Sequence, residues 1–392
     1  MPDSNSYRAG RHFLQIPGPS NVPDRILRAI AQPTIDHRGP EFAELTLGIL
    51  AKLAPLFHTA SPVFIFPASG TGAWESSLLN TLSPGDKVLA FETGHFATLW
   101  KNLAEKLGLK VEWVTGDWRH GIDPDVVEQH LRADKGHSIK AVLAVHTETS
   151  SGATSGIKQI REAIDAANHP ALLMVDAVSS LGCSDFRHDD WGVDVSISAS
   201  QKGLMLPPGL CFNAVSEKAL QASKHSGFHH SYWSWKEMLE LNKKGYFPYT
   251  PSTNLLYGLD EALSMLHAEG MDCVIQRHAR LAHATRLAVE GWGLEIFCLK
   301  PEEYSNSTTA VVMPEGHDAD HLRGVILDRF NMSLGMGLGK VKGKVFRIGH
   351  LGDFNELMLA GTLAGVDMGL SAAAVPHNKG GLNAALDFLA SD

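Results

Sequence analysis

Between residues 60 and 215 the sequence alternates short apolar runs with segments that have the composition of helices. Seven runs are typical of β-strands: 63–66, 87–91, 110–115, 140–145, 171–175, 193–198 and 209–214. This alternation predicts an α/β fold in which a mostly parallel sheet is covered by helices on both faces. Such sheets bind ligands beyond the carboxyl ends of their strands, so functional side chains are expected there.

The chain has 392 residues, whereas a single hydrophobic core stops growing at roughly 250 to 300 residues. A second, smaller lobe is therefore expected. The largely helical segment 216–292 predicts a long helix that crosses between the lobes, and beyond it strands at 310–313 and 345–348 and helices at 319–330 and 355–370 predict a small α/β domain. We expect an N-terminal arm at 1–20, a large domain at 21–275 and a small C-terminal domain at 276–392, with a tail after Ala372 that carries little information.

Composition and charge exclude several kinds of partner. The formal net charge of -9 argues against nucleic acid or an anionic membrane surface. The four cysteines show no CxxC spacing, and no apolar run approaches the roughly 20 residues of a membrane span. We therefore predict a cytoplasmic protein. The adjacent His229 and His230 have no carboxylate or cysteine at ligand spacing, so solvent-facing or packing histidines are favoured over a metal site.

The segment Ser69-Gly70-Thr71-Gly72 lies between the strand at 63–66 and a helix predicted at 73–82. Glycines let the backbone approach an anion, hydroxyls donate to it, and a helix N-terminus adds free N–H groups and a positive dipole end. The segment therefore suits a phosphate. It is neither a P-loop nor GxGxxG, and a plain strand-to-helix turn is an equal alternative.

Asp176 and Lys202 each follow a predicted buried strand. A carboxylate at a strand's carboxyl end needs a cation or hydrogen bonds to offset its charge, and a pyridinium nitrogen would serve. Partial burial would lower the pKa of a lysine amine there and make it a nucleophile. Taken alone, Asp176 could instead cap a helix and Lys202 could lie in a surface loop. With one strand between them, however, neighbouring strand ends would present both groups to the same crevice.

Arg347 occurs within the apolar strand-like run at 344–350 of the predicted small domain. An arginine that points into a cleft is suited to bidentate capture of a carboxylate. An edge-strand arginine that faces water is the equal alternative.

Together these features resemble the serine–glyoxylate / alanine–glyoxylate aminotransferase family, in class V of the fold-type I pyridoxal 5′-phosphate (PLP) enzymes. The resemblance covers the chain from Pro17 to about Leu370. It is carried by seven motifs in order: 66–75 (FPASGTGAWE), 82–86 (LSPGD), 146–152 (HTETSSG), 175–180 (VDAVSS), 200–203 (SQKG), 248–251 (PYTP) and 344–349 (KVFRIG). The family has a large domain with a mostly parallel seven-stranded sheet between helices and a small C-terminal α/β domain.

The resemblance implies catalytic roles for two residues. Lys202 would bind PLP as a Schiff base and move the proton between Cα of the amino acid and C4′ of the cofactor. Asp176 would keep the pyridine nitrogen protonated. Arg347 would hold the substrate α-carboxylate, in a substrate site shared with Thr149 and Lys202.

The resemblance also implies the rest of the cofactor site. The phosphate would be held by Ser69, Gly70, Thr71 and Gln201, with Thr250 reaching it from the partner subunit of a homodimer. Thr149 would lie near O3′ of the cofactor, and Phe96 would stack on the pyridine ring. Tyr249 is assigned to the cofactor site as well.

The reaction implied is a ping-pong transamination from an amino donor to glyoxylate, which gives glycine and a 2-oxo acid. Serine is the preferred donor, alanine is possible, and an aspartate–glyoxylate aminotransferase is the alternative. A lyase or cysteine desulfurase is less favoured because neither Cys273 nor Cys298 lies in a Gly/Ser-rich loop. A non-catalytic protein would have no use for Lys202 and Asp176 together. The chain departs from the family at 228–235, where an acidic residue is missing.

Overall fold

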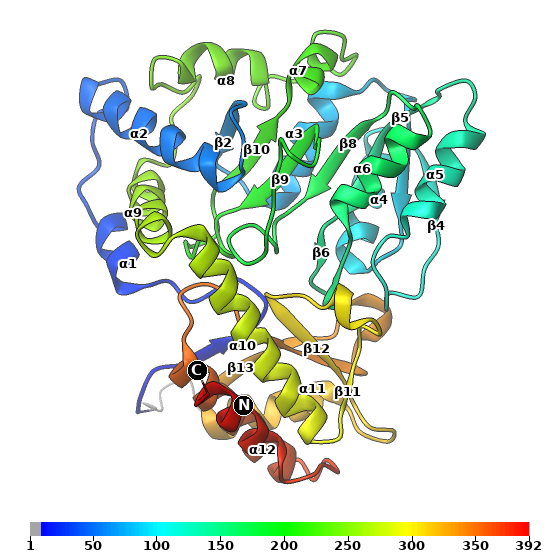
Figure 1. The fold of residues 1–392 in the computed structure, drawn as a ribbon. Coiled ribbons are helices and arrows are strands. Elements are labelled where there is room, and N and C mark those ends of the chain that lie inside the picture. The colour runs from blue at the N-terminus through cyan, green and yellow to red at the C-terminus, as the bar shows by residue number, and fades with distance from the viewer. Residues whose placement is uncertain (1–8, 392) are drawn as a thin grey trace.

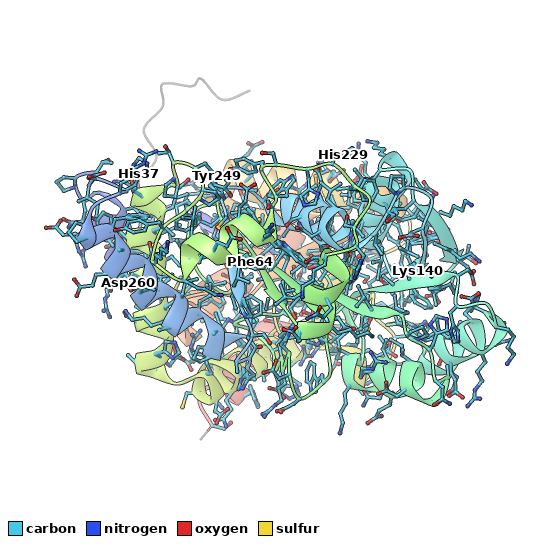
Figure 2. The ribbon with its side chains drawn as sticks, turned by 90° about the horizontal axis from the view of Figure 1, so that it is seen from above. His37, Phe64, Lys140, His229, Tyr249 and Asp260 are labelled. Carbon is cyan, nitrogen blue, oxygen red and sulfur yellow. The ribbon has the colours of Figure 1, made fainter. Side chains whose placement is uncertain are left out.

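The computed structural model describes residues 9–391 and shows two lobes, each with its own sheet (Figure 1). Residues 1–8 of the predicted N-terminal arm lie outside the described residues. Seen from above (Figure 2), Asp260 and Lys140 lie at opposite ends of the large lobe, with Phe64 between them. The sequence-based expectation of an α/β protein with a large and a small lobe is confirmed.

Seven strands form the sheet of the large lobe, in the order β2-β10-β9-β8-β5-β3-β4. Their bounds are β2 (Val63–Phe66), β3 (Lys87–Phe91), β4 (Lys110–Val114), β5 (Ile139–Val145), β8 (Leu172–Asp176), β9 (Val195–Ala199) and β10 (Cys211–Val215). All neighbours are parallel except β10, which is antiparallel to both β2 and β9. The predicted mostly parallel seven-stranded sheet is confirmed, and the limits of each predicted run agree with a strand to within two residues.

Helices and a short hairpin surround this sheet. They are α1 (Asp24–Ile30), α2 (Pro40–Leu56), α3 (Gly70–Thr81), α4 (His95–Lys106), α5 (Pro124–Ala133), α6 (Ile157–Ala166), α7 (Glu217–Ser223), α8 (Trp235–Asn242) and α9 (Thr253–Glu269), with the hairpin β6 (Thr147–Glu148) and β7 (Ala153–Thr154). Helix α3 packs against β9 and β10, and α4 packs against β3 and β5. Strands β8 and β9 are buried at every residue, as expected for central strands between two helical layers.

The small lobe has a five-stranded sheet in the order β1-β13-β14-β12-β11. Its elements are β1 (Phe13–Gln15), β11 (Glu295–Ile296), β12 (Thr308–Val312), β13 (Met332–Met336), β14 (Val345–Gly349), α10 (Met271–Gly291), α11 (Ala319–Phe330), α12 (Glu356–Ala372) and α13 (Gly381–Leu389), with short 3-10 helices at Pro301–Glu303 and Gly339–Val341. Strand β1 comes from the beginning of the chain and pairs in parallel with β13. Part of the predicted N-terminal arm is therefore an edge strand of this sheet.

The largely helical segment 216–292 includes the predicted long helix that crosses between the lobes, α10. It contains α7, α8, α9 and α10, and Gly270 separates the last two with a φ of 85°. Helix α10 crosses between the lobes (Figure 1): Val274 packs in the apolar cluster of the large lobe and Leu281 in that of the small lobe. The proposed domain division at residue 275 is consistent with these two clusters and stays a prediction.

The tail after Ala372, which the sequence left without an assignment, forms α13 and packs against α10. The guanidinium of Arg280 on α10 lies over the ring of Phe388 and donates to the carbonyl of Leu389. Among residues 9–391, no helix combines the length and the apolar character needed to cross a membrane.

Candidate active site

The carboxyl ends of β8 and β9 border a cavity of about 270 Å³. Asp176 is the last residue of β8, and Lys202 lies three positions beyond the end of β9. Because these strands are parallel neighbours, both side chains reach the same cavity, as the sequence predicts. The cavity is lined by Gly18, Pro19, Ser69, Gly70, Thr71, Trp74, Phe96, Thr147, Thr149, Asp176, Val178, Ser179, Gln201, Lys202 and Pro208.

Lys202 is buried, with 8% of its surface exposed, so the surface-loop alternative is excluded. Burial, and next the positive charge of Arg347, lower the pKa of its amine to about 8. Its Nζ donates to the carbonyl oxygen of Pro17. A pKa near 8 leaves part of the amine neutral at neutral pH, and the neutral amine is the nucleophilic form.

Asp176 is a buried carboxylate that has hydrogen-bond donors but no cationic side chain in contact among residues 9–391. Oδ1 accepts from the backbone N–H of Val178 at 2.7 Å, and Oδ2 accepts from Nε1 of Trp74 at 2.9 Å. Burial raises the pKa of this carboxyl to about 7 against the effect of these hydrogen bonds. No helix of the described chain begins directly after Asp176, which excludes the helix-cap alternative. A cation against Asp176 would offset the cost of its buried charge.

The glycine-containing turn forms the first turn of α3, because the helix starts at Gly70 and thus three residues earlier than predicted. Ser69 precedes it as the N-cap, but its side chain makes no capping hydrogen bond. No residue among 9–391 forms a hydrogen bond with the N–H groups of Gly70 and Thr71 or with the hydroxyls of Ser69 and Thr71. These free donors at a helix N-terminus face the cavity and suit an anion.

Three further predicted residues line the same cavity. Phe96 lies in the first turn of α4, and Thr149 follows β6, where its hydroxyl lies 3.0 Å from that of Ser179. Gln201 precedes Lys202, and its buried Oε1 has no hydrogen-bond partner among the described residues. Such an orphaned polar atom beside free helix N–H groups is expected where a polar ligand completes a site.

Arg347 of the small lobe does not itself line the cavity but contacts Thr149, which does. It lies on β14, between β12 and β13, and is 7% exposed, so the edge-strand alternative is wrong. Its Nε donates to the carbonyl of Met336 and its Nη1 to that of Thr149, each at 2.9 Å. Burial lowers the pKa of the guanidinium to about 10, which leaves it charged at neutral pH. Its Nη2 makes no hydrogen bond with a described residue and can bind a carboxylate.

Tyr249 and Thr250 do not line the cavity of their own chain. The Tyr249 ring stacks on that of Tyr232, with centroids 4.3 Å apart and planes at 7°. Thr250 is exposed. Tyr249 and His229 lie along the same edge of the molecule in Figure 2.

The segment 228–235, where a departure from the family pattern is expected from the sequence, packs against α3. A Cβ at Gly72 would lie 2.7 Å from the ring of Trp233, whose carbonyl accepts from Nδ2 of Asn80 at 2.8 Å. Nε2 of His230 lies 3.1 Å from Oδ1 of the same asparagine. The segment thus supports the helix whose N-terminus borders the cavity.

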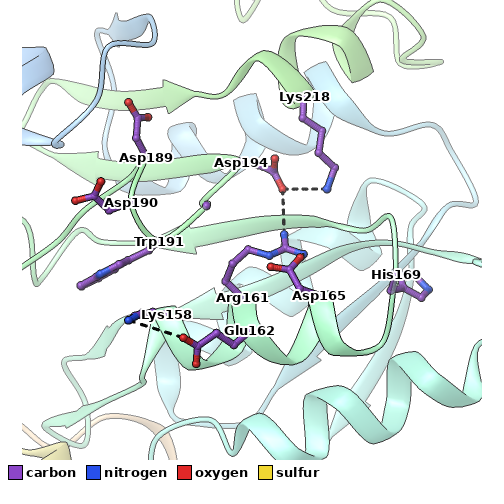
Figure 3. A pocket seen from close by; sticks show the side chains of 11 residues that line it. Lys158, Arg161, Glu162, Asp165, His169, Asp189, Asp190, Trp191, Asp194 and Lys218 are labelled. Carbon is purple, nitrogen blue, oxygen red and sulfur yellow. Dashed lines mark hydrogen bonds and ion pairs between the residues drawn. The ribbon is translucent and has the colours of Figure 1, made fainter.

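A second pocket, of about 560 Å³, lies elsewhere on the large lobe and has a charged lining (Figure 3). Asp194 pairs there with Lys218 at 3.4 Å and with Arg161 at 3.8 Å. None of the predicted site residues lies in this pocket. The cavity that holds Lys202 and Asp176 is therefore the candidate active site.

Several lining residues were not assigned by sequence reasoning, namely Gly18, Pro19, Trp74, Thr147, Val178, Ser179 and Pro208. Trp74 could have been found, because it lies four positions after Gly70 in a helix, and residues so spaced share one face. No sequence pattern predicts that Gly18 approaches Lys202, because this contact depends on how the beginning of the chain crosses the cavity.

The polar groups of the cavity match the functional groups of PLP. The start of α3 offers donors for a phosphate, Asp176 offers a carboxylate for a pyridinium nitrogen, and Lys202 offers an amine for the aldehyde. All three are directed into one enclosed space of this chain.

Comparisons with known proteins agree with this chemistry. A family described as "Aminotransferase class-V" matches residues 12–338. A serine–glyoxylate aminotransferase of Methylorubrum extorquens is 48% identical over 97% of both chains, and an L-aspartate–glyoxylate aminotransferase of Paracoccus denitrificans is 43% identical over 93% of this chain and 92% of that protein. The crystal structure of pyridoxamine–pyruvate aminotransferase from Mesorhizobium loti superposes with a TM-score of 0.91 at 28% identity, covering 98% of each chain. The chain therefore belongs to the class-V aminotransferases, whose cofactor is pyridoxal 5′-phosphate.

Proposed function

We propose that this enzyme transfers the amino group of serine to glyoxylate, which gives glycine and a 2-oxo acid in two half-reactions. One observation carries the proposal: Lys202 and Asp176 share a cavity, and Arg347 donates to the carbonyl of Thr149, a residue of its wall. Alanine is a second possible donor. The relative from Methylorubrum extorquens, which is named for serine and glyoxylate, supports the choice of substrates.

In this proposal two residues act at the reacting atoms. When bound, PLP supplies an electron sink for the carbanion formed at Cα of the amino acid. Lys202 would hold the cofactor through its amine and would carry the proton between Cα of the amino acid and C4′ of the cofactor. Its lowered pKa, about 8, suits it to accept and return a proton near neutral pH. Asp176 would keep the pyridine nitrogen protonated, because its buried carboxylate would accept a hydrogen bond from that N–H.

The remaining predicted residues bind and orient. Ser69, Gly70 and Thr71 would hold the phosphate through the free donors at the start of α3, together with Gln201 from the loop after β9. Phe96 would cover a face of the pyridine ring of PLP, and Thr149 would contact its O3′. Arg347 binds the substrate α-carboxylate through its available Nη2, since Nε and Nη1 are fixed by backbone carbonyls.

The lining favours a donor with a small, neutral side chain. Apart from Lys202, the described lining residues carry no cationic side chain. Aspartate brings a second carboxylate, whose burial requires a cation or several hydrogen-bond donors. Serine and alanine therefore fit the cavity of this chain better. The alternative of an aspartate–glyoxylate aminotransferase draws on the Paracoccus denitrificans relative.

A donor panel tests this choice. The purified enzyme is supplied with PLP and glyoxylate, and glycine formation is measured with serine, alanine and aspartate. We expect the highest kcat/KM with serine and parallel lines in double-reciprocal plots, which are typical of ping-pong kinetics. If only aspartate gave turnover, the proposal of serine as the donor would be rejected, but the proposal of transamination would stand.

The cysteine desulfurase alternative requires a reactive thiol on a mobile loop. Cys273 lies in α10, and Cys298 is buried with a thiol pKa raised to about 11 by burial. Burial disfavours the thiolate of Cys298, and Cys273 lies within a helix instead of on a mobile loop. A non-catalytic role is opposed by the amine and carboxylate held together in the cavity.

Two properties of the whole protein belong to this proposal. We propose a homodimer, in which Tyr249 and Thr250 contribute to the cofactor site of the partner subunit, because their own chain does not bring them to its cavity. A cytoplasmic location is also proposed.

A further inference from the structure

Glu148 is a buried carboxylate, 1% exposed, between two residues of the cavity wall, Thr147 and Thr149. Its Oε1 accepts from the backbone N–H of Ser150 at 3.0 Å and from the Ser150 hydroxyl at 2.7 Å. Its Oε2 accepts from the backbone N–H groups of Phe96 and Ala97, both at 3.1 Å. Each carboxylate oxygen of Glu148 therefore accepts two hydrogen bonds, although the side chain does not line the cavity itself.

These hydrogen bonds complete the N-terminus of α4. The first N–H groups of a helix have no partner within the helix, and its positive dipole end favours an anion. The N-cap of α4 is Gly94, which has no side chain that could accept them. Glu148 accepts hydrogen bonds from the N–H groups of Phe96 and Ala97, and the Ser150 hydroxyl accepts one from the N–H of His95 at 2.9 Å. The cap thus comes from a segment more than fifty residues away in the chain.

The same carboxylate is linked to two parts of the site. On one side it fixes the backbone of Phe96, whose ring lines the cavity. On the other side it fixes the turn that contains Thr149, whose carbonyl accepts from Nη1 of Arg347. A shift of Glu148 would therefore move both a wall of the cavity and the anchor of the arginine.

We propose that Glu148 is a positioning residue. Through its hydrogen bonds to the first turn of α4 and to the backbone N–H of Ser150 after β6, it fixes the positions of Phe96 and Arg347 relative to each other. The inference rests on the proposed function where it assigns Phe96 to the cofactor and Arg347 to the substrate carboxylate.

Only a carboxylate can meet all the donors around Glu148. An amide of the same shape has one acceptor oxygen and one NH₂ group. In Glu148→Gln, the NH₂ group must therefore face either the two N–H groups of α4 or the donors of Ser150. A buried donor left without an acceptor is costly, and the first turn of α4 should open more readily.

The first test uses cofactor-free protein, so that it does not depend on catalysis. Deuterium uptake by peptides covering residues 94–98 is compared between wild type, Glu148→Gln and the control Asp194→Asn. Asp194 is a matched control because it is also a buried carboxylate, 4% exposed, that accepts from the backbone N–H of Leu173 at 2.8 Å and lies in the charged pocket of Figure 3. We expect faster exchange at 94–98 in Glu148→Gln and wild-type exchange there in Asp194→Asn.

The second test uses the PLP-loaded enzyme. In Glu148→Gln we expect kcat/KM to fall at least about tenfold, as for the loss of a hydrogen bond to a charged group. Part of this fall should be a higher KM for both carboxylate substrates. The hydroxyl-deletion variant Ser150→Ala should change both readouts in the same direction, which keeps the inference testable if Glu148→Gln does not fold.

The inference is overturned if Glu148→Gln, or Ser150→Ala in its place, leaves exchange at 94–98 and kcat/KM unchanged. It is also overturned if exchange rises uniformly over the molecule, since that indicates a general loss of stability. A wild type that performs no transamination would reject the proposed function, while the exchange experiment would still decide whether Glu148 fixes α4.

Discussion

Lys202 is held by segments that lie far apart in the sequence. Its Nζ donates to the carbonyl of Pro17, and its own carbonyl accepts from the hydroxyl of Ser20 at 2.9 Å. The position of Lys202 after a buried strand could be predicted, because buried central strands are continuous apolar runs. The contacts from residues 17–20 could not, since they depend on a chain crossing that leaves no local pattern.

The amine of Lys202 should control how fast the protein captures PLP. We expect the capture rate of the cofactor-free protein to rise with pH and to level off above a midpoint near 8, because the neutral amine attacks and its pKa is lowered to about 8. In Arg347→Gln the midpoint should move to higher pH, since a charge that lowers this pKa is removed. Stopped-flow absorbance measures the rate. A wild-type midpoint at about 10, the ordinary value for lysine, would contradict the environment described.

Gly18 should tolerate no larger side chain. A Cβ there would lie 2.6 Å from Nζ of Lys202, and the φ of Gly18 is 109°. We therefore expect Gly18→Ala to weaken PLP binding about tenfold or more, because the added methyl group would displace the amine of Lys202 and the backbone at residue 18 would be strained. Gly10→Ala is the control, because Gly10 also has a positive φ, 85°, but nothing within 4 Å of its Cβ position. Equal affinity in the two variants, measured by cofactor titration, would contradict the steric argument.

Among the elements, those with strong local patterns were predicted well and those that depend on distant pairing were not. Helix α11 has the predicted limits, 319–330. Strand β1 has three residues and forms only by pairing with β13, and α13 follows a small-residue segment. Helix α3 was predicted to start three residues too late, because Gly70 and Gly72 disfavour helix locally while packing against β9 and β10 holds them in it.

The start of α3 should recognise the phosphate of the cofactor specifically. We expect Thr71→Val to weaken binding of PLP about tenfold, the scale of one hydrogen bond to a charged group, and to leave binding of pyridoxal, which has no phosphate, unchanged. Thr253→Val is the control, because Thr253 also begins a helix but lies outside the cavity. Fluorescence titration with both ligands measures the effect. Equal weakening of pyridoxal would place Thr71 in contact with another part of the cofactor.

At the scale of the whole molecule, the site is assembled from both lobes. Arg347 belongs to the sheet of the small lobe, yet its Nη1 binds the Thr149 carbonyl of the large lobe. Its strand could be predicted from an apolar run, but its burial could not, because that depends on how the lobes meet. Tyr249 and Thr250 lie outside this cavity; Thr250 remains the predicted contribution of a partner subunit, and Tyr249 is proposed to accompany it.

Subunit complementation tests that contribution. Lys202→Ala and Thr250→Trp should each be inactive as pure proteins, the first without the amine and the second with a blocked phosphate site in the partner. After mixing and subunit exchange, we expect activity to return, because each mixed dimer has one site with an intact Lys202 and an intact Thr250. Absence of recovery, with mixed dimers demonstrated by mass, would show that each chain builds its site alone.

The central claim is that Lys202 in this cavity binds PLP covalently. The enzyme is loaded with PLP, reduced with borohydride and digested, and the modified peptide is identified by mass spectrometry. The account predicts the phosphopyridoxyl group on Lys202, together with loss of the visible absorption band, and no reducible adduct in folded Lys202→Ala. A label on a different lysine, or a reducible adduct that persists in Lys202→Ala, would contradict it.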